Sequence, residues 1–286
     1  MSLQRSQIES VVAMALAEDA PFGDITSQTF VPAATTATAE LVAREPGIFA
    51  GADVLEVAMT ALDDTVKVAL LAADGDRFGR GQTLARVEGP ARAILQAERV
   101  ALNLVQRMCG IATLTATYVD AVAAVPGAKA RVVDTRKTTP GLRALERHAV
   151  RCGGAHNHRY SLSDAVMAKD NHLAVVGDIG AAIRRARAEL PHTTHIEVEI
   201  DRLDQLDTVL GARPDTIMLD NFSLEDLAEG VRRVDGRVIV EASGGITLDT
   251  IGDVARTGVD VISVGALTHS VRALDLGLDV VVQAGR

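Results

Sequence analysis

The second half of the chain repeats one pattern, in which a short run of β-branched residues is followed by a helical stretch. The strand-like runs are 131–134, 165–169, 195–200, 216–219, 237–242 and 260–264, and the helical stretches are 141–152, 178–190, 202–210, 223–234 and 247–257. Strands that alternate regularly with helices form parallel sheets with crossover helices. The pattern therefore predicts an α/β fold, either an α/β barrel with fewer strands than the standard barrel or an open doubly wound sheet.

The first part of the chain does not show this regular alternation of strands and helices, which indicates a separate domain. An apolar stripe predicts a helix over 5–18, and alternating residues predict a strand that begins at residue 36 and reaches the turn Glu45-Pro46-Gly47. Residues 51–62 are expected to be helical, 64–88 to form short strands, and 90–124 to form two helices with a break near Gly110. A chain of 286 residues has room for roughly two domains.

Charge and composition exclude several classes of function. The chain carries 29 Lys and Arg against 38 Asp and Glu, a net charge of −9, so it lacks the cationic surface that general nucleic-acid binding needs. No apolar run is long enough to span a bilayer, and the N-terminus lacks the pattern of a secretory signal. Cys109 and Cys152 have no metal-ligand spacing, so we expect reduced thiols in a cytoplasmic protein with no nucleic-acid or membrane partner.

Polar residues follow each of the predicted parallel strands. They are Thr135-Arg136-Lys137-Thr138, Lys169-Asp170-Asn171-His172, Glu197 with Glu199, Asp220-Asn221, Ser243-Gly244-Gly245 and Gly265-Ala266. The carboxyl ends of the strands form the active site in α/β barrels. Solvated loops are the alternative explanation, but six consecutive strand ends of this kind favour an active site.

Two of these strand ends are rich in glycine. Glycines let backbone N–H groups approach an anion closely, and the N-terminus of a following helix favours negative charge. Ser243-Gly244-Gly245 and Gly265 are therefore candidates for a phosphate site, the alternative being two tight turns that need glycine for their geometry.

Positive charge is concentrated in residues 129–159 of this acidic chain. The cluster comprises Lys129, Arg131, Arg136, Lys137, Arg143, Arg147, Arg151 and Arg159, together with His148, His156 and His158. Such a cluster predicts a pocket for a small anion. Arg143, Arg147 and Arg151 are spaced four apart and are equally consistent with one solvated helix face, whereas Arg136, Lys137 and Arg159 fall in loops and are better site candidates.

Two carboxylates and one lysine complete the candidate site. Glu199 and Asp220 lie at successive strand ends, where they can hold Mg²⁺ with substrate phosphates or bind ribose hydroxyls. Glu197 is two residues from Glu199 and so lies on the same face of the predicted strand, and one of the two can be purely structural. Lys169 follows an apolar run, so we expect it to be partly buried, with an anionic partner or as a neutral base or Schiff-base nucleophile.

Several strings of the sequence are similar to those of a known family. They are ERVALNLVQRMCGIAT (98–113), DTRKTTPGLR (134–143), RCGGAHNHRYSLSDAVMAKDNH (151–172), EVEID (197–201), IMLDNF (217–222), EASGGI (241–246) and VGALTHS (264–270). Together they resemble the quinolinate phosphoribosyltransferase family. The resemblance covers essentially the whole chain, including GDITS near its beginning.

The resemblance implies a fold, an activity and an assembly. It implies an N-terminal α/β sandwich domain at 1–112 and an incomplete α/β (TIM-like) barrel at 113–270, with 271–286 packing back on the first domain. The implied reaction converts quinolinate and phosphoribosyl pyrophosphate, with Mg²⁺, to nicotinate mononucleotide, pyrophosphate and CO₂ in NAD synthesis. The family usually forms homodimers, and a hexamer is a further option.

The resemblance also assigns roles by motif position. It places Thr135, Arg136, His158, Arg159 and Lys169 around quinolinate, with Arg99 reaching the site of the partner subunit. Lys137 would contact pyrophosphate, and Glu199 and Asp220 would bind the ribose hydroxyls or Mg²⁺. Ser243, Gly244, Gly245, Gly265 and His269 would surround the 5′-phosphate. Lys137, Lys169, Glu199 and Asp220 are the expected catalytic residues.

One loop of the sequence departs from the family pattern. Ala155 stands where the family often has a third glycine, followed by His156, which bears on the backbone around His158. Asn157 favours the quinolinate enzyme over a relative linked to molybdenum transport.

The competing functions are a phosphoribosyltransferase for nicotinate or another ring acid, a non-catalytic sensor of a phosphate ligand, and a Schiff-base aldolase that uses Lys169.

Overall fold

The computed structural model describes residues 3–169, 172 and 175–281, and its contacts divide the chain into two compact units. The first unit comprises Met1–Ala116, Thr138–Gly154 and Leu267–Arg286, and the second comprises Thr117–Lys137 and Ala155–Ala266. The segment that follows the first strand of the second unit thus belongs to the first unit. The domain boundaries drawn from the sequence, at 112/113 and 270/271, lie at different residues and stay predictions.

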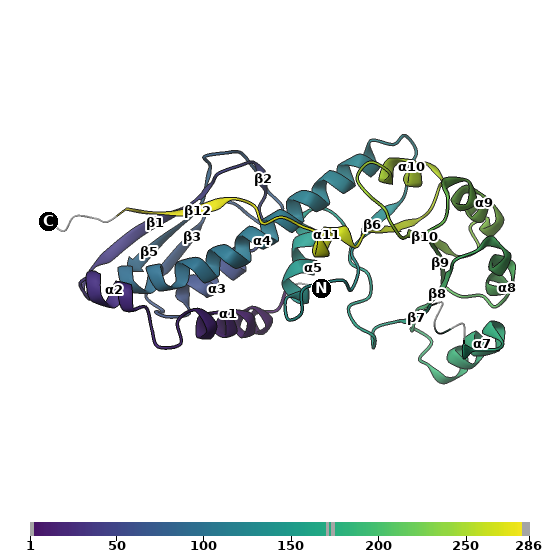
Figure 1. Ribbon diagram of the computed structural model, residues 1–286, viewed down its shortest axis with the longest axis horizontal. Helices are drawn as coiled ribbons and strands as arrows, with labels where there is room; N and C mark the ends of the chain where they lie inside the picture. Colours follow the sequence, from purple (N-terminus) through teal and green to yellow (C-terminus); the bar gives the residue numbers. More distant parts are fainter. Residues whose placement is uncertain (1–2, 170–171, 173–174, 282–286) are drawn as a thin grey trace. The chain divides into compact units, whose positions relative to one another are not determined.

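The first unit contains a four-stranded antiparallel sheet in the order β12-β1-β5-β3 (Figure 1). Its strands are β1 (Thr36–Ala43), β3 (Lys67–Leu70), β5 (Thr83–Pro90) and β12 (Leu276–Val281), and β2 (Gly47–Ile48) pairs with β4 (Arg77–Phe78). The alternation in β1 is confirmed, because Ala37, Ala39, Leu41 and Ala43 are buried. The pairing of β12 with β1 brings Leu276–Val281 onto this sheet.

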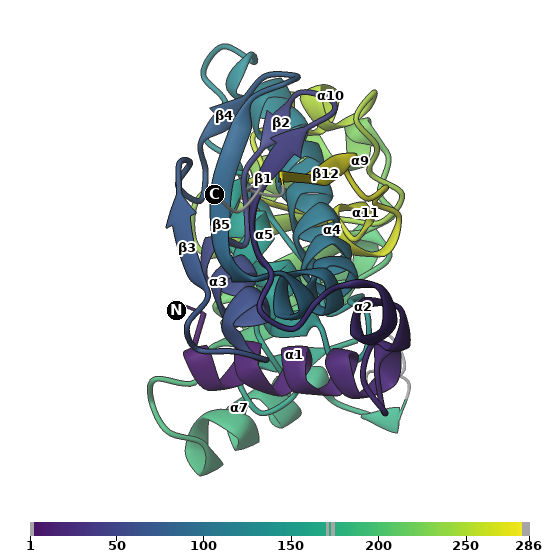
Figure 2. The same cartoon turned by 90° about the vertical axis from the view of Figure 1, so that its left-hand side faces the viewer.

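Helix α4 (Ala91–Ala123) runs along one face of this sheet (Figure 2). The first unit holds α1 (Arg5–Asp19), α2 (Ile25–Phe30), α3 (Ala52–Thr60), α5 (Arg143–Cys152) and most of α4 (Ala91–Ala123) and α11 (Ala266–His269). The stripe predicted for the first helix is confirmed, since Ile8, Val11, Val12 and Leu16 are buried. Within the described part of the chain, no helix has the length and apolar content that crossing a membrane requires.

The predicted break near Gly110 is wrong, because α4 continues without interruption from Ala91 to Ala123. Glycine in a helix interior costs about 1 kcal/mol relative to alanine, which is why the sequence favoured a break. At this position a Cβ atom would collide with the backbone carbonyl of Arg272. Gly110 therefore permits a close approach of two backbones, and the packing on either side keeps the helix continuous.

The second unit is an incomplete α/β barrel, as the family resemblance implied and as one of the two folds that the strand–helix repeat allowed (Figure 1). Its six parallel strands are β6 (Arg131–Val133), β7 (Val166–Ala168), β8 (Ile196–Ile200), β9 (Thr216–Asp220), β10 (Ile239–Ser243) and β11 (Val261–Ser263). Their order is β6-β11-β10-β9-β8-β7, so β6 and β7 are the two edges and the barrel does not close between them. The helices are α7 (Ile179–Glu189), η1 (Leu203–Gln205), α8 (Leu206–Gly211), α9 (Leu224–Val234) and α10 (Ile251–Arg256).

Strand β8 shows how the barrel supplies polar groups to its interior. All five of its residues are buried, so both faces of the strand are covered. Ile196, Val198 and Ile200 share one face, and Glu197 and Glu199 share the other, because side chains alternate along a strand. Burying two carboxylates on one face requires partners for both, and those partners belong to the candidate site.

Candidate active site

The structure brings most of the predicted site residues to the carboxyl ends of the parallel strands of the second unit. Thr135, Arg136 and Lys137 follow β6, Lys169 follows β7, Glu199 lies in β8, Asp220 ends β9, Ser243 ends β10, and Gly265 follows β11. Asp220 and Ser243 are register partners across β9 and β10. Parallel strands end at the same edge of their sheet, and this is the edge at which α/β barrels carry their active sites.

Two predicted residues belong to the first unit instead. Arg99 is exposed on α4, and His269 is exposed at the end of α11, where its Nδ1 lies 2.6 Å from the Ser270 hydroxyl. Asp170 and Asn171 of the KDNH string lie outside the described residues.

Lys169 has an anionic partner, as its position after an apolar run led us to expect. Its Nζ lies 2.5 Å from Oε2 of Glu199, which joins the end of β7 to the neighbouring strand β8. The lysine side chain is 43% exposed and the glutamate side chain 10% exposed, so the pair opens to solvent on the lysine side. A charged, partnered lysine of this kind is suited to binding an anion rather than to forming a Schiff base.

Two guanidinium groups lie close enough to influence each other. Burial lowers the pKa of Arg159, and the positive charge of Arg136 lowers it further. Nη1 of Arg159 donates a hydrogen bond to the backbone carbonyl of Ala165, 2.9 Å away, which fixes the orientation of the side chain. Like charges gathered in this way favour the binding of an anion between them, and planar guanidinium groups suit carboxylates in particular.

A buried aspartate organises the loop that carries His158 and Arg159. Asp134, which is fully buried after β6, accepts hydrogen bonds from Nδ2 of Asn157 (2.6 Å) and from the backbone N–H of His158 (2.8 Å). His156 also forms a parallel bridge with Val133 at the edge of the sheet. The loop with the unusual Ala155-His156 pair thus extends the β6 edge, and the Asp134 carboxylate fixes its backbone. Asp134 was not among the predicted site residues.

His158 contacts two buried glutamates of the barrel interior. Its Nε2 lies 3.3 Å from Glu197 and 3.4 Å from Glu241, and its Nδ1 lies 2.7 Å from the backbone nitrogen of Arg159. The Nε2 proton is therefore directed at the carboxylates. Burial lowers the pKa of an imidazole, but the two carboxylates outweigh burial, and the pKa of His158 is raised. Glu241 was missed because nothing distinguishes it in the sequence from an ordinary strand residue.

The glycine-rich loop after β10 is built around Asn221. Gly244 has a φ of +90°, and a Cβ atom at this position would lie 2.8 Å from the backbone nitrogen of Asn221. That nitrogen donates to the carbonyl of Ser243 (2.9 Å), and the Asn221 side chain donates to Asp220 (2.7 Å). Gly245 has a φ of +61° with open space around it. The turn after β10 therefore does need glycine for its geometry, and it leaves open space beside Gly245.

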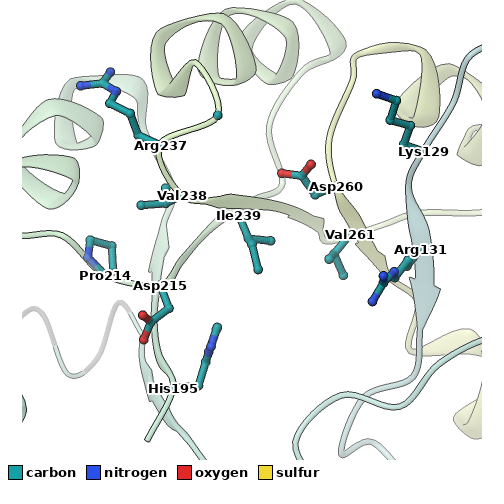
Figure 3. A pocket seen from close by; sticks show the side chains of 11 residues that line it. Lys129, Arg131, His195, Pro214, Asp215, Arg237, Val238, Ile239, Asp260 and Val261 are labelled. Carbon is teal, nitrogen blue, oxygen red and sulfur yellow. The ribbon is translucent and has the colours of Figure 1, made fainter. Parts of the chain in front are cut away.

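The cluster of positive charge predicted for residues 129–159 is divided in the structure. Lys129 and Arg131 lie at the amino-terminal end of β6, where they line a hollow of about 750 Å³ with His195, Asp215 and Arg237 (Figure 3). Arg136 and Lys137 lie beyond the other end of the same strand. No residue predicted for the active site lines this hollow. The cluster therefore did not represent one pocket, because a strand of three residues separates its members.

The three helical arginines also differ in environment. Arg147 is buried, Arg151 is exposed, and Arg143 donates to the Thr138 hydroxyl at 3.0 Å. One solvated helix face does not account for all three. Lys137 is exposed, and its backbone N–H donates to the Thr135 hydroxyl at 3.1 Å, which forms the turn after β6.

Comparisons with known proteins cover almost the whole chain. Residues 24–109 match the model of "Quinolinate phosphoribosyl transferase, N-terminal domain", and residues 111–279 match the corresponding C-terminal domain. Nicotinate-nucleotide pyrophosphorylase [carboxylating] of Mycobacterium leprae is 49% identical over 277 residues, which are 94% of this chain and 95% of that protein. A probable enzyme of the same name from Bacillus subtilis is 43% identical over 274 residues, or 96% and 93% of the two chains.

A solved structure of a protein with the same name is similar to this chain over almost its whole length. The nicotinate-nucleotide pyrophosphorylase from Francisella tularensis superimposes with a TM-score of 0.93 at 38% sequence identity, and the match covers 98% of each chain.

Proposed function

This chain belongs to the quinolinate phosphoribosyl transferase family, and from that premise we propose how its residues carry out the reaction. The enzyme transfers a phosphoribosyl group from phosphoribosyl pyrophosphate to quinolinate. The transfer is followed by decarboxylation, so that the products are nicotinate mononucleotide, pyrophosphate and CO₂. The reaction is a step in NAD biosynthesis.

The charge of Arg136 acts on Arg159, and this coupling of two cations supports the assignment of the substrate pocket. Quinolinate presents two neighbouring carboxylates on one ring, and two guanidinium groups can bind them through paired hydrogen bonds. Arg159 is already oriented by its hydrogen bond to Ala165. Lys169 adds a third cation, which is held by Glu199 at the next strand end. Thr135 and His158 complete the pocket.

The transfer step needs positioning and electrostatic stabilisation rather than a protein nucleophile. The ring nitrogen of quinolinate attacks C1 of the ribose as pyrophosphate leaves, and positive charge develops on the sugar. Fixed carboxylates stabilise such charge, and Glu199 and Asp220 have this role. Lys137 binds the departing pyrophosphate, since an exposed ammonium group suits a point-charge contact. Ser243, Gly244, Gly245 and Gly265 surround the 5′-phosphate, with His269 as a further contact.

The carboxylates Glu199 and Asp220 also fit the Mg²⁺ that accompanies phosphoribosyl pyrophosphate. Mg²⁺ in such sites is bound by one or two carboxylates together with substrate phosphates and water. Oε2 of Glu199 is occupied by Lys169, and Oδ2 of Asp220 accepts from Asn221, so each carboxylate retains one further oxygen for a cation. When bound, Mg²⁺ neutralises the charge of the leaving pyrophosphate.

Decarboxylation follows transfer because the ribosylated ring nitrogen is cationic. That charge stabilises the carbanion left on the adjacent ring carbon when CO₂ departs. The reaction therefore relies on the substrate's own electronics, and the protein's main task is to bring two anionic substrates together against their repulsion.

The assay that tests this function measures both products from one substrate. Purified protein with phosphoribosyl pyrophosphate, Mg²⁺ and quinolinate labelled in the leaving carboxylate is expected to release labelled CO₂ and nicotinate mononucleotide in equal amounts. Higher turnover of nicotinate than of quinolinate would identify a different ring-acid transferase. Ligand binding without turnover would identify a sensor, and covalent trapping of Lys169 by borohydride would identify an aldolase.

We also propose that the active enzyme is at least a homodimer in which Arg99 enters the partner's site. The exposure of Arg99 on α4, in the unit that lacks the barrel, supports this arrangement. Mixing inactive Arg99→Ala and Arg159→Ala variants under subunit exchange would restore roughly a quarter of the wild-type activity, because each mixed dimer contains one intact site. No recovery after verified exchange would contradict it. A cytoplasmic location also remains part of the proposal, supported by two free cysteines.

A further inference from the structure

A second group of chemically active side chains lies in the first unit and shares no residue with the proposed active site. It consists of Asp74, in the loop between β3 and β4, and of His148 and Cys152 on α5. One carboxylate oxygen, one imidazole nitrogen and the thiol sulfur all lie within 4.8 Å of one another. The proposed reaction makes no use of these three residues.

The three side chains are positioned by two rigid elements. His148 and Cys152 are four residues apart on α5 and therefore project from the same face of the helix. Oδ1 of Asp74 accepts hydrogen bonds from the backbone N–H groups of Gly51 (2.8 Å) and Ala52 (3.0 Å) at the beginning of α3. This anchoring leaves Oδ2 of Asp74 facing Nε2 of His148 at 2.5 Å.

We propose that Asp74, His148 and Cys152 bind one Zn²⁺ ion, with water as the fourth ligand. A carboxylate, an imidazole and a thiolate are the three ligand types that zinc uses in proteins. A nitrogen and a sulfur ligand disfavour Mg²⁺ and Ca²⁺, which bind oxygen almost exclusively. The carboxylate and the thiolate together carry two negative charges, which balance the charge of the ion.

Only a small rearrangement admits the ion. Two ligands of a tetrahedral zinc ion lie about 3.3 Å apart, given bonds of about 2.0–2.1 Å to nitrogen and oxygen. Asp74 and His148 therefore need to separate by a fraction of one bond length. Their side chains are 24% and 25% exposed, so the ion has a route from solvent and His148 has freedom to rotate. The anchored Asp74 stays in place because its other oxygen is bound to the α3 backbone.

The thiol is the ligand whose chemistry changes on binding. Burial raises the pKa of the Cys152 thiol, and the neighbouring Asp74 carboxylate raises it further. A thiol that ligates zinc loses its proton, so ion binding releases one proton to solvent. The bound ion would connect α5 to the β3–β4 loop and, through Asp74, to the beginning of α3.

Cobalt(II) is the probe for this site, because a cobalt–thiolate bond gives an intense near-ultraviolet charge-transfer band. Protein without a polyhistidine tag is titrated with Co²⁺ and then with Zn²⁺. We expect one equivalent of Co²⁺ to produce the band and Zn²⁺ to abolish it. Cobalt at Glu199, Asp220 or the His158 cluster would give no such band, since no sulfur lies among those ligands.

The matched variants are Cys152→Ser and Cys109→Ser. Cys109 is buried beside the cluster, but its Sγ contacts the backbone of Ala50 and is not among the three ligand atoms, so its replacement should leave the band unchanged. Cys152→Ser should abolish the band, and His148→Ala should weaken Co²⁺ binding by at least about tenfold. No band in the wild type, or an undiminished band in Cys152→Ser, would overturn the proposal.

Thermal unfolding provides a second readout that does not depend on catalysis. A ligand that binds only the folded state raises the unfolding temperature. Zn²⁺ should therefore raise the unfolding temperature of the wild type and of Cys109→Ser but not that of Cys152→Ser. If Cys152→Ser fails to fold, His148→Gln, which keeps the thiol, replaces it in both measurements. An equal shift in the wild type and in the folded cluster variant would contradict the site, whatever the enzyme assay shows.

Discussion

Lys169 and Glu199 form an ion pair, with Nζ and Oε2 separated by 2.5 Å, that connects the ends of two neighbouring barrel strands. The lysine side chain is 43% exposed. The Glu199 side chain is only 10% exposed, so Lys169 partners a carboxylate that is largely buried. The pair therefore serves the fold by partnering this carboxylate, and its position at the strand ends, open to solvent on the lysine side, suits it to the substrates.

The first prediction uses Lys169→Met and Glu199→Gln to separate the role of this ion pair in stability from its role in the reaction. Glu199→Gln, which removes the charge, should change the free energy of unfolding by less than about 1 kcal/mol, as measured by urea denaturation. Lys169→Met leaves the Glu199 carboxylate largely buried without this partner and should cost about 1–3 kcal/mol. Lys169→Met should raise the KM for quinolinate, and Glu199→Gln should mainly lower kcat, because its carboxylate acts on the charge of the transition state. Loss of several kcal/mol of stability with unchanged kinetics would make the pair structural.

The second prediction concerns Arg159, whose pKa is lowered by burial and by the charge of Arg136. Arg159→Ala should weaken quinolinate binding by about 2–5 kcal/mol, as when a hydrogen-bonded charge loses its partner. Calorimetric binding of phosphoribosyl pyrophosphate should be unaffected. Arg131→Ala is the matched control, since Arg131 lies at the other end of β6, and it should bind quinolinate normally. Unchanged quinolinate affinity in Arg159→Ala would move the pocket elsewhere.

The third prediction concerns Asp134, which orients the loop of His158. Asp134→Asn keeps the shape of the side chain but replaces one accepting oxygen by an NH₂ group. That group would face Nδ2 of Asn157 or the backbone N–H of His158, both of which are donors themselves. Leaving such buried groups unsatisfied costs about 1–3 kcal/mol, so urea unfolding should show a loss of this size. The KM for quinolinate should rise at the same time. A stability loss with an unchanged KM would mean that the loop does not orient the pocket.

The barrel was predictable because its signals are local, whereas the contacts that shape the site are not. Runs such as 195–200 contain enough β-branched and apolar residues to identify each strand, and the polar residues that follow them mark the active edge. Asp134 and Asn157 are 23 residues apart, and Asp74 and His148 are 74 apart. A single sequence does not show that such distant residues meet. At Gly110 the local signal was misleading, because packing against Arg272 overrode helix propensity.

The fourth prediction uses the two glycines after β10, which differ in their surroundings but not in the sign of φ. Gly244→Ala would place a Cβ atom against Asn221, in addition to the strain of a left-handed backbone. We expect it to destabilise the fold by about 1–3 kcal/mol and to raise the KM for phosphoribosyl pyrophosphate, because the displaced loop is the proposed phosphate site. Gly245→Ala meets open space, so only the backbone strain of about 1–2 kcal/mol applies to its folding. Urea unfolding and steady-state kinetics on both variants test this ordering. A larger loss in Gly245→Ala than in Gly244→Ala would contradict the packing of Asn221 over the loop.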